Sequence, residues 1–301
     1  MAASANKRLL LKIFSLFSVV RGYNILVVVI AQYLTSAFIL AHEKPLREVL
    51  FDPNLFFLIL ASSSTIASGY IINNFYDSEK DLINRPKKTM LDRIVSQRTK
   101  LSVYFILNFA TIFFASYVSF RAVVFFSIYI FVIWLYSHRL KKILFLGNLV
   151  ASILTITPFF VIFVYYKNFE TVIFIHATFL YLMIVMRELV KDLENMQGDL
   201  VQNYRTIPLV YGEKWSKFCL AVCSIVAIVP IYLLITRFEL GYMDYYFYVS
   251  FILLIIFLLM LYFSKAKWQY LLLHNILKLI IVTGVFSILL IDLDEVINRV
   301  F

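Results

Sequence analysis

Nine long apolar segments run through this chain of 301 residues, and they constrain its fold more than any other feature. They cover residues 23–41, 55–72, 101–120, 122–136, 143–166, 171–186, 218–236, 245–263 and 270–291. A helix needs about 20 predominantly apolar residues to cross the hydrocarbon core of a bilayer. Because lipid cannot hydrogen-bond to exposed backbone groups, each segment is predicted to be a transmembrane α-helix. The sequence therefore predicts an all-α integral membrane protein, a bundle of about nine transmembrane helices.

Composition and loop charge support this interpretation and orient the bundle. Hydrophobic residues make up 62% of the chain and charged residues only 15%, against about a quarter in soluble domains. Most of the 28 Lys and Arg residues lie on one side of the predicted bundle, at positions 7–21, 80–100, 139–142, 187–217 and 265–267. Because cytoplasmic loops carry the excess of Lys and Arg, the N-terminus is predicted to be cytoplasmic and the C-terminus outside.

The chain is expected to form a single transmembrane domain over residues 1–301, which in a bacterium would lie in the inner membrane. Residues 1–21 interleave Lys7, Arg8 and Lys12 with apolar residues, which predicts an amphipathic helix on the membrane surface. Residues 78–100 and 193–215 are expected to form loops that cap the cytoplasmic face of the bundle.

A set of polar residues lies where the second apolar segment meets a basic loop. Asn73, Asp77 and Asp81, which we call the first ladder, recur every four residues. At about 100° per helical residue, a four-residue step drifts by only about 40°, so all three side chains point from one face. Acidic groups at the mouth of a membrane helix are costly, and they therefore indicate a functional site.

A second set of polar residues follows the sixth apolar segment. Glu188, Asp192, Asn195 and Asp199, which we call the second ladder, recur at steps of four, three and four. This spacing forms one face of a helix leaving the membrane. Ordinary solvated helix ends also carry such charges. Two ladders on the same predicted side, each followed by basic residues, favour a binding site instead.

The residue types of the two ladders indicate a particular chemistry. Clustered carboxylates repel one another unless cations neutralise them, and little water screens that repulsion at a membrane mouth. Oxygen ligands without Cys or His suit a hard cation, and Mg²⁺ commonly combines one or two carboxylates with substrate phosphate. Lys and Arg residues between the ladders would bind the remaining phosphate oxygens. The set predicts a magnesium–diphosphate site, and neither ladder has the spacing of a calcium-binding EF-hand.

Both ladders, with their flanking residues, resemble the two signatures of the UbiA superfamily of intramembrane prenyltransferases. The first resemblance covers the first ladder and the Asn84-Arg85-Pro86 stretch, and the second covers Arg187-Glu188 and residues 191–199. The resemblance extends over most of the chain. It implies a bundle of nine helices with both motifs at cytoplasmic-side helix ends.

The chain departs from the family pattern at two places. The family often has Asp where this chain has Asn195, so this position is expected to hydrogen-bond without carrying a charge. A second Arg-Pro pair usually follows Asn84-Arg85-Pro86, and Lys87-Lys88-Thr89 stands there in this chain. That replacement keeps the positive charge and loses the rigid turn.

What the resemblance implies is Mg²⁺-dependent transfer of a polyprenyl group from its diphosphate to an acceptor. The implied catalytic and metal-binding residues are Asp77, Asp81, Asp192 and Asp199. The implied substrate-binding residues are Arg21, Asn24, Asn73, Arg85, Lys88, Arg93, Lys141, Lys191, Asn195 and Arg205. Among these, Asn73 would give the metal a further oxygen, and Arg85, Lys88, Arg93, Lys141 and Lys191 would stabilise the departing pyrophosphate.

The acceptor is expected to be a membrane lipid, with a second acceptor class left open. Arg21-x-x-Asn24, Tyr136-Ser137, Leu140-Lys141-Lys142 and Gly147-Asn148 resemble the branch that contains geranylgeranylglycerol-phosphate geranylgeranyltransferases. The resemblance implies geranylgeranyl transfer to the hydroxyl of geranylgeranylglycerol phosphate. An aromatic acceptor, as in quinone or chlorophyll-type tail attachment, could use Arg21 and Asn24 equally well. Membrane lipids are expected partners, and nucleic acid is not.

A membrane transporter is the alternative of another class. Transporters typically place polar residues near the middle of the membrane, in helices that Gly or Pro breaks. In this chain the apolar segments are largely uninterrupted, with Pro158 and Pro230 as the main breaks, and both ladders lie at one surface. The pattern favours an enzyme.

Overall fold

The computed structural model describes residues 2–291 of the chain, and their side chains from residue 10 onward. Over these residues the protein is helical and contains no strand. Nine helices among them are long and apolar enough to cross a membrane. Their bounds are Gly22–Leu40, Pro53–Tyr76, Gln97–Val118, Phe120–His138, Leu146–Tyr166, Thr171–Val201, Glu213–Arg237, Met243–Phe263 and Lys267–Leu290. The predicted all-α membrane fold is confirmed.

The chain divides into two compact units, each built from several stretches of sequence. Unit 1 comprises Met1–Val29, Pro53–Lys141 and Gln197–Tyr204. Unit 2 comprises Ile30–Asp52, Lys142–Met196 and Arg205–Phe301. The single domain over residues 1–301 stays a prediction.

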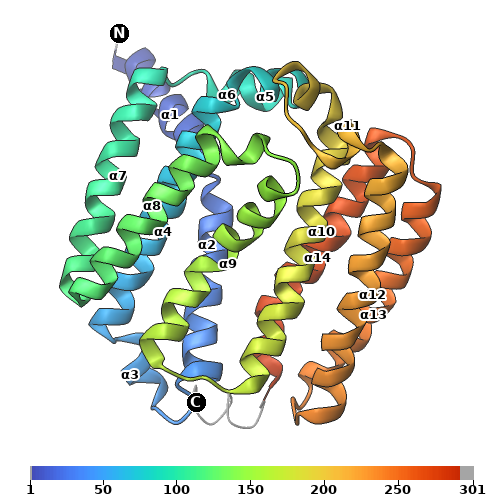
Figure 1. The fold of residues 1–301 in the computed structure, drawn as a ribbon. Helices are drawn as coiled ribbons and strands as arrows, with labels where there is room; N and C mark the ends of the chain where they lie inside the picture. Colours follow the sequence, from blue (N-terminus) through green and yellow to red (C-terminus); the bar gives the residue numbers. More distant parts are fainter. Residues whose placement is uncertain (1, 292–301) are drawn as a thin grey trace. The chain divides into compact units, whose positions relative to one another are not determined.

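Helix α4 (Pro53–Tyr76) is the centre of unit 1. It packs along α7 (Gln97–Val118) and α8 (Phe120–His138), as Figure 1 shows. Small residues let these helices approach closely, because a Cβ atom at Gly69 would lie only 3.1 Å from Ile133 Cγ2. A buried hydrogen bond of 3.2 Å from Thr65 Oγ1 to Thr111 Oγ1 joins α4 to α7. The small polar residues of α4 therefore serve helix packing.

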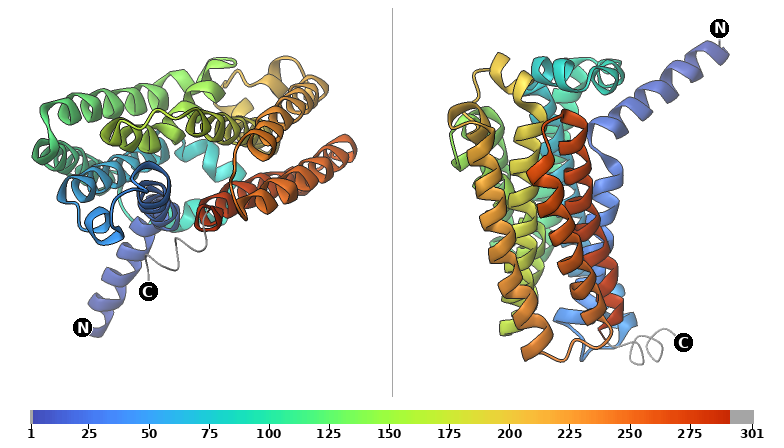
Figure 2. Two further views of the ribbon diagram at one scale, coloured as in Figure 1. Left: turned by 90° about the horizontal axis from the view of Figure 1, so that it is seen from below. Right: turned by 90° about the vertical axis from the view of Figure 1, so that its right-hand side faces the viewer.

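Three shorter helices of unit 1 adjoin this core. They are α1 (Ala2–Val19), α5 (Ser78–Asn84) and α6 (Pro86–Asp92). Helix α1 leaves the axis of α2 (Gly22–Thr35) at an angle, at a turn where Arg21 has φ 51° (Figure 2). Leu10, Phe14 and Phe17 lie exposed along α1, the spacing of an amphipathic helix. Placement of residues 1–21 on the membrane surface stays a prediction, and the side chains of Lys7 and Arg8 lie outside the described residues.

Unit 2 is a second helical assembly with its own apolar core. Its elements are η1 (Ser36–Leu40), α3 (Leu46–Leu50), α9 (Leu146–Tyr166), most of α10 (Thr171–Val201), α11 (Ile207–Val210), α12 (Glu213–Arg237), α13 (Met243–Phe263), α14 (Lys267–Ser287) and η3 (Ile288–Leu290). Helix α13 packs against both α12 and α14 (Figure 2). Met186, Leu220, Phe247 and Leu273 are fully buried in the core of this unit.

The two segments that the sequence analysis expected to be capping loops contain helix. Helix α10 runs from Thr171 to Val201, so the second ladder lies on a helix that continues beyond the apolar segment, as its spacing predicted. Leu189, Val190 and Leu193 are buried although charged residues surround them in sequence. This packing stabilises the helix beyond the apolar segment. The segment 193–215 therefore begins as helix and also contains α11, and the segment 78–100 contains α5 and α6. Whether these segments cap a site stays a prediction.

Candidate active site

The first ladder keeps its helical spacing across a helix junction in unit 1. Asp77 lies between α4 and α5, with φ −93° and ψ 7°. The backbone N–H of Asp77 still donates to Asn73 O at 2.9 Å, and that of Asp81 to Asp77 O at 2.8 Å. Because these bonds preserve the four-residue step, the three side chains follow one helical face, as the sequence predicted.

Two oxygen atoms of the ladder converge on one cation. Lys141 Nζ lies 2.7 Å from Asp77 Oδ1 and 3.3 Å from Asn73 Oδ1. Lys141 follows α8 and is buried, as is Asp77. A buried charge needs a partner of opposite sign, and here each group supplies it to the other. The structure thus places one predicted pyrophosphate ligand, Lys141, directly against the predicted metal ligands.

Tyr204 is a site residue that sequence reasoning missed. Its Oη donates to Asp77 Oδ1 at 2.6 Å. Lys80 Nζ lies 4.2 Å from the centre of the Tyr204 ring, and Lys141 Nζ lies 5.8 Å from it. The ring therefore interacts with two ammonium groups while its hydroxyl binds the carboxylate. No sequence signal separates Tyr204 from the other 19 tyrosines, because its role depends on contacts more than 60 residues away.

The end of α10 that belongs to unit 1 brings Asp199 to α5. Asp199 is fully buried, and Lys80 Nζ lies 2.5 Å from its Oδ1. One residue earlier, the N–H of Gly198 donates to Asn84 Oδ1 at 3.3 Å. A Cβ atom at Gly198 would lie 2.3 Å from Asn84 Nδ2, so only glycine fits this contact. Asn84 therefore holds the peptide that carries Asp199, a role that its motif did not predict.

The two aspartates of the first ladder differ in charge behaviour. Burial disfavours ionisation of Asp77, but Lys141 and Lys80 outweigh it and hold the pKa of this carboxyl below its ordinary value. Burial and the nearby charge of Asp77 raise the pKa of Asp81, against the opposing effect of Arg21 and other cations. Burial and the charge of Asp77 also raise the pKa of Tyr204, which keeps its hydroxyl protonated as a donor.

A group of cations surrounds Asp81 in unit 1. Arg21 and Arg85 both favour the ionised form of Asp81 electrostatically. Burial and the neighbouring charge of Arg21 lower the pKa of Lys88. Arg21 Cζ lies 5.1 Å from the centre of the Tyr70 ring. The predicted residues Arg21, Arg85 and Lys88 are thus brought together, and Arg93 is exposed after α6.

Asn24 joins this region through the same tyrosine. Its Nδ2 donates to Tyr70 Oη at 3.2 Å. Tyr70 therefore receives a guanidinium on its ring and an amide on its hydroxyl. This arrangement connects Arg21 and Asn24, which the sequence had grouped as an acceptor-binding pair.

The remainder of the second ladder lies in unit 2. Asn148 Nδ2 donates to Asp192 Oδ2 at 2.8 Å, which orients that carboxylate. Glu188 is buried, with Lys191 Nζ 2.8 Å from one of its oxygens. Lys191, predicted to bind pyrophosphate, is therefore paired with a carboxylate in this structure.

Two further predicted residues belong to unit 2. Asn195 is buried on α10. Arg205 is exposed, and its backbone N–H donates to Lys142 O at 3.2 Å. Close by on α10, Glu194 Oε2 lies 3.4 Å from His274 Nδ1, so this buried histidine has a carboxylate partner.

The donor set of unit 1 fits a hard cation. Among residues 2–291, no group of three or more His, Cys, Asp or Glu side chains lies close enough to ligate a metal. However, Asn73 Oδ1 and Asp77 Oδ1 already converge on the ammonium group of Lys141. Carboxylate and amide oxygens of this kind are the donors that Mg²⁺ prefers. The residues are therefore chemically suited to a divalent cation.

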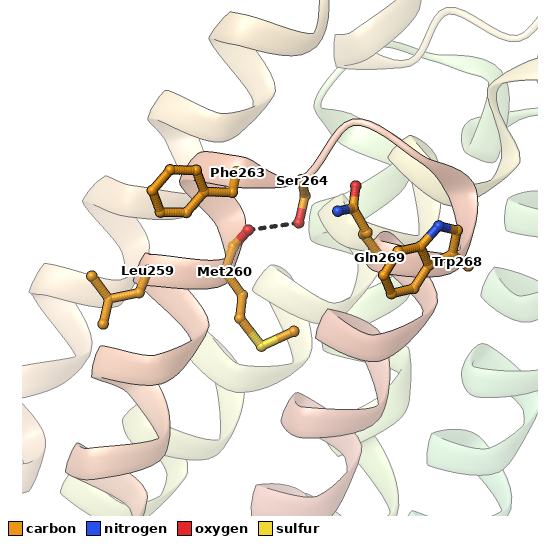
Figure 3. Close-up of a pocket in the computed structure, with 6 residues that line it drawn as sticks. All are labelled: Leu259, Met260, Phe263, Ser264, Trp268 and Gln269. Carbon is orange, nitrogen blue, oxygen red and sulfur yellow. Dashed lines mark hydrogen bonds between the residues drawn. The ribbon is translucent and has the colours of Figure 1, made fainter.

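A pocket in unit 2 has different chemistry. It lies at the turn between α13 and α14, shown in Figure 3. Its lining residues are Leu259, Met260, Phe263, Ser264, Trp268 and Gln269. Ser264 Oγ is engaged with Met260 O at 2.7 Å, the dashed line in Figure 3. Because all six lining residues are uncharged, the pocket does not match a diphosphate site.

Sequence comparison places the chain among known enzymes. Residues 25–275 match the UbiA prenyltransferase family. A digeranylgeranylglyceryl phosphate synthase from Thermococcus sibiricus is 30% identical over 213 residues, which cover 70% of this chain and 73% of the relative. A protein of the same name from Thermococcus gammatolerans is 29% identical over 181 residues, or 60% of this chain. That match spans 64% of the relative, slightly under two thirds of its length.

Structural comparison gives the same fold. A solved structure described as digeranylgeranylglyceryl phosphate synthase superimposes with a TM-score of 0.67 at 21% identity, covering 92% of this chain and 97% of the other. A UbiA homolog from Archaeoglobus fulgidus, bound to GPP and Mg²⁺, superimposes with a TM-score of 0.66 at 10% identity. It covers 91% of this chain and 99% of the homolog.

Proposed function

Because the chain belongs to the UbiA prenyltransferase family, we propose that this enzyme transfers a geranylgeranyl group from its diphosphate to a lipid hydroxyl. The observation that carries the proposal is the cluster in which Asp77 contacts Lys141 and Tyr204. It combines a buried carboxylate with a buried ammonium group, the two chemistries that a magnesium diphosphate requires. Membership of a prenyltransferase family favours an enzyme over a membrane transporter.

We propose that Mg²⁺ is held by carboxylates from both ladders, with amide oxygens beside them. The proposed metal ligands are Asp77, Asp81, Asp192 and Asp199. Asn73 would add an oxygen, and Asn195 would add a hydrogen bond. When bound, the ion would neutralise charge on the diphosphate and so favour its departure. The homolog from Archaeoglobus fulgidus that binds GPP and Mg²⁺ supports this proposal.

The cations of the chain would then receive the leaving group. The proposed set is Arg85, Lys88, Arg93, Lys141 and Lys191. Lys141 is buried beside Asp77, so its charge is presented where little water can screen it. Such fixed charges stabilise the pyrophosphate as the bond to the prenyl carbon weakens. Residues 78–100 and 193–215 would exclude water from the allylic cation.

The acceptor is proposed to be geranylgeranylglycerol phosphate. Its hydroxyl oxygen would bond to C1 of the prenyl group while the C1–O bond to diphosphate breaks, and the released diphosphate, which keeps the bonding electron pair, would accept the hydroxyl proton. Arg21 and Lys88 lie near Asp81, with Arg205 as a further proposed ligand, and such cations suit the acceptor phosphate. The synthase from Thermococcus sibiricus, named for such a product, supports this choice.

The proposed orientation in the membrane follows from loop charge. The ladders, and therefore the active site, would face the cytoplasm together with the N-terminus. The C-terminus would lie outside, and residues 292–301 are beyond the described part of the chain.

A transfer assay with two acceptors tests the proposed function. Purified protein in detergent receives radiolabelled geranylgeranyl diphosphate, Mg²⁺ and either geranylgeranylglycerol phosphate or an aromatic acid. We expect labelled lipid with the first acceptor only, and its loss on chelation and in Asp77→Asn. Glu170→Gln, which changes an exposed carboxylate of unit 2, should transfer normally. Product with the aromatic acid alone would show that the acceptor is aromatic and not the glycerol lipid. No product with either acceptor would contradict the proposed function.

A further inference from the structure

A buried polar cluster lies on α4 beside the first ladder but around the helix from it. Asn74 follows Asn73, and one residue rotates the side chain by about 100°. Asn74, Asp92 and Lys100 are 8%, 3% and 1% exposed, and they come from α4, α6 and α7. Three buried polar side chains from three helices need a reason, because burial of unpaired polar groups is costly.

The amide of Asn74 lies between two opposite charges. Lys100 Nζ donates to Asn74 Oδ1 at 2.8 Å, and Asn74 Nδ2 donates to Asp92 Oδ2 at 3.3 Å. An amide can accept from an ammonium group and donate to a carboxylate at the same time. An aspartate at position 74 would keep the first bond and repel Asp92. The hydrogen bonds of the cluster therefore require an amide at position 74, between the ammonium group of Lys100 and the carboxylate of Asp92.

The same carboxylate connects α6 to α1. Ser18 Oγ donates to Asp92 Oδ1 at 2.9 Å. Ser15 Oγ donates to Leu91 O at 2.8 Å. Helix α6 is thus bound to α1 on one side and, through Asn74, to α4 and α7 on the other. Figure 1 shows α1, α6 and the start of α7 at the same end of unit 1.

Helix α6 requires such external support. It has only seven residues, Pro86–Asp92, and helices much shorter than about 12 residues are marginal in water by themselves. It also carries Lys88, whose Nζ lies 3.8 Å from Asp92 Oδ2. The contacts that fix Asp92 therefore also fix the position of Lys88 on α6.

We propose that Asn74, Asp92 and Lys100 are positioning residues that fix α6 so that Lys88 meets the diphosphate. This inference rests on the proposed function. The cluster does not touch the reacting atoms but acts through Lys88. Its disruption should weaken diphosphate binding more than the chemical step.

An exchange of residues between positions 74 and 92 tests the cluster. Asn74→Asp alone sets two carboxylates against each other, and Asp92→Asn alone leaves Lys100 without a nearby negative charge. The double variant Asn74→Asp/Asp92→Asn restores the three hydrogen bonds, although the ion pair of Lys88 with residue 92 stays lost. The new carboxylate accepts from Lys100 and from the new amide, whose oxygen accepts from Ser18. A control pair, Lys44→Met and Glu48→Gln, removes an exposed ion pair of unit 2.

Two readouts separate positioning from stability alone. We expect each single variant to raise KM for geranylgeranyl diphosphate roughly tenfold, about 1.4 kcal/mol, while kcat changes less than about threefold. The rate of backbone hydrogen exchange in residues 86–92 should rise in the single variants and return to the wild-type rate in the double variant. The control variants should match wild type in both measurements.

The outcomes distinguish failure of this inference from failure of the proposed function. Unchanged KM and unchanged exchange in residues 86–92 of the single variants would overturn the positioning role. Hydrogen exchange in residues 86–92 that stays as fast in the double variant as in the single variants would overturn it too. Wild-type protein that transfers no prenyl group would contradict the proposed function instead, and exchange across residues 86–92 would still decide whether the cluster holds α6.

Discussion

At the scale of single residues, two buried aspartates of unit 1, Asp77 and Asp199, are each paired with a lysine. Asp77 is buried with Lys141 at 2.7 Å and the Tyr204 hydroxyl at 2.6 Å, both on the same oxygen. Asp199 is buried with Lys80 at 2.5 Å. Each carboxylate therefore has a lysine that also approaches the Tyr204 ring. Tyr204 is the residue that these two ion pairs share.

Replacing Tyr204 tests this shared role. Tyr204→Phe keeps the ring near Lys80 and removes the hydrogen bond to Asp77. Because a hydrogen bond to a charged group contributes about 1.5–3 kcal/mol, we expect kcat/KM for prenyl transfer to fall by roughly 10- to 100-fold. Tyr204→Leu, which also removes the ring, should fall further. Tyr211→Phe changes an exposed tyrosine and serves as the control. Equal activity in Tyr204→Phe and wild type would contradict the role.

The lowered pKa of Asp77 also predicts that the stability of the fold depends on pH. Its pKa in the folded protein lies below the ordinary value of 3.8, so the ionised form stabilises the fold above that value. This stabilisation is lost as the pH falls through the lower, folded pKa. In metal-free detergent solution, the difference in Tm between wild type and Asp77→Asn should be largest above about pH 4 and shrink below it. A Tm difference that grows on acidification would show that the pKa of Asp77 is raised in the folded protein and not lowered.

At the scale of elements, the contact between α5 and the end of α10 places Asp199. Gly198 N donates to Asn84 Oδ1, and a Cβ atom at position 198 would clash with the Asn84 side chain. Short elements such as α5 are therefore held by a few specific contacts and respond strongly to single changes.

Gly198→Ala should separate α5 from the end of α10. The added Cβ atom would meet Asn84 Nδ2 at 2.3 Å, and such overpacking typically costs about 1–3 kcal/mol. We expect a lower Tm together with reduced prenyl transfer. In the double variant Gly198→Ala/Asn84→Ala the clash is removed, so Tm should recover in part. Thermal unfolding in detergent measures both, and a single variant as stable as wild type would show that the contact is unimportant.

At the scale of the whole molecule, the protein is a multi-pass membrane enzyme of the UbiA prenyltransferase family. Nine described helices are apolar enough to span a bilayer. The basic residues fall on alternate loops of this succession, which gives the proposed orientation its physical basis. The proposed active site then has access to both cytoplasmic Mg²⁺ and membrane lipid.

Cysteine labelling tests this orientation. After replacement of Cys219 and Cys223 by alanine, single cysteines are introduced as Lys44→Cys and Lys265→Cys. In intact cells, a membrane-impermeant maleimide should label position 44 and not position 265. Permeabilised cells should show labelling at both positions. The reverse pattern in intact cells would place the N-terminus outside.

The sequence predicted much of the fold because its signals are local. The length of each apolar run determines a transmembrane helix, and the four-residue step fixes which side chains share a face. The spacing of the second ladder predicted helix through residue 199, but residues 193–215 were also expected to form a loop, and the first part of that segment is helical to Val201. Lys80 and Tyr204 were not singled out, since a lysine in a basic loop and one tyrosine among 20 carry no local signal.

By itself, the sequence determined the helical membrane fold, the two ladders and the kinds of ligand that they favour. Only the tertiary structure decided which cation meets which carboxylate: Lys141 with Asp77, and Lys80 with Asp199. It also decided that Asn74 faces away from the ladder and toward Asp92. Hydrophobic length and helical period act between neighbours in sequence, whereas these pairs join residues from 18 to more than 100 positions apart and arise only when the helices pack.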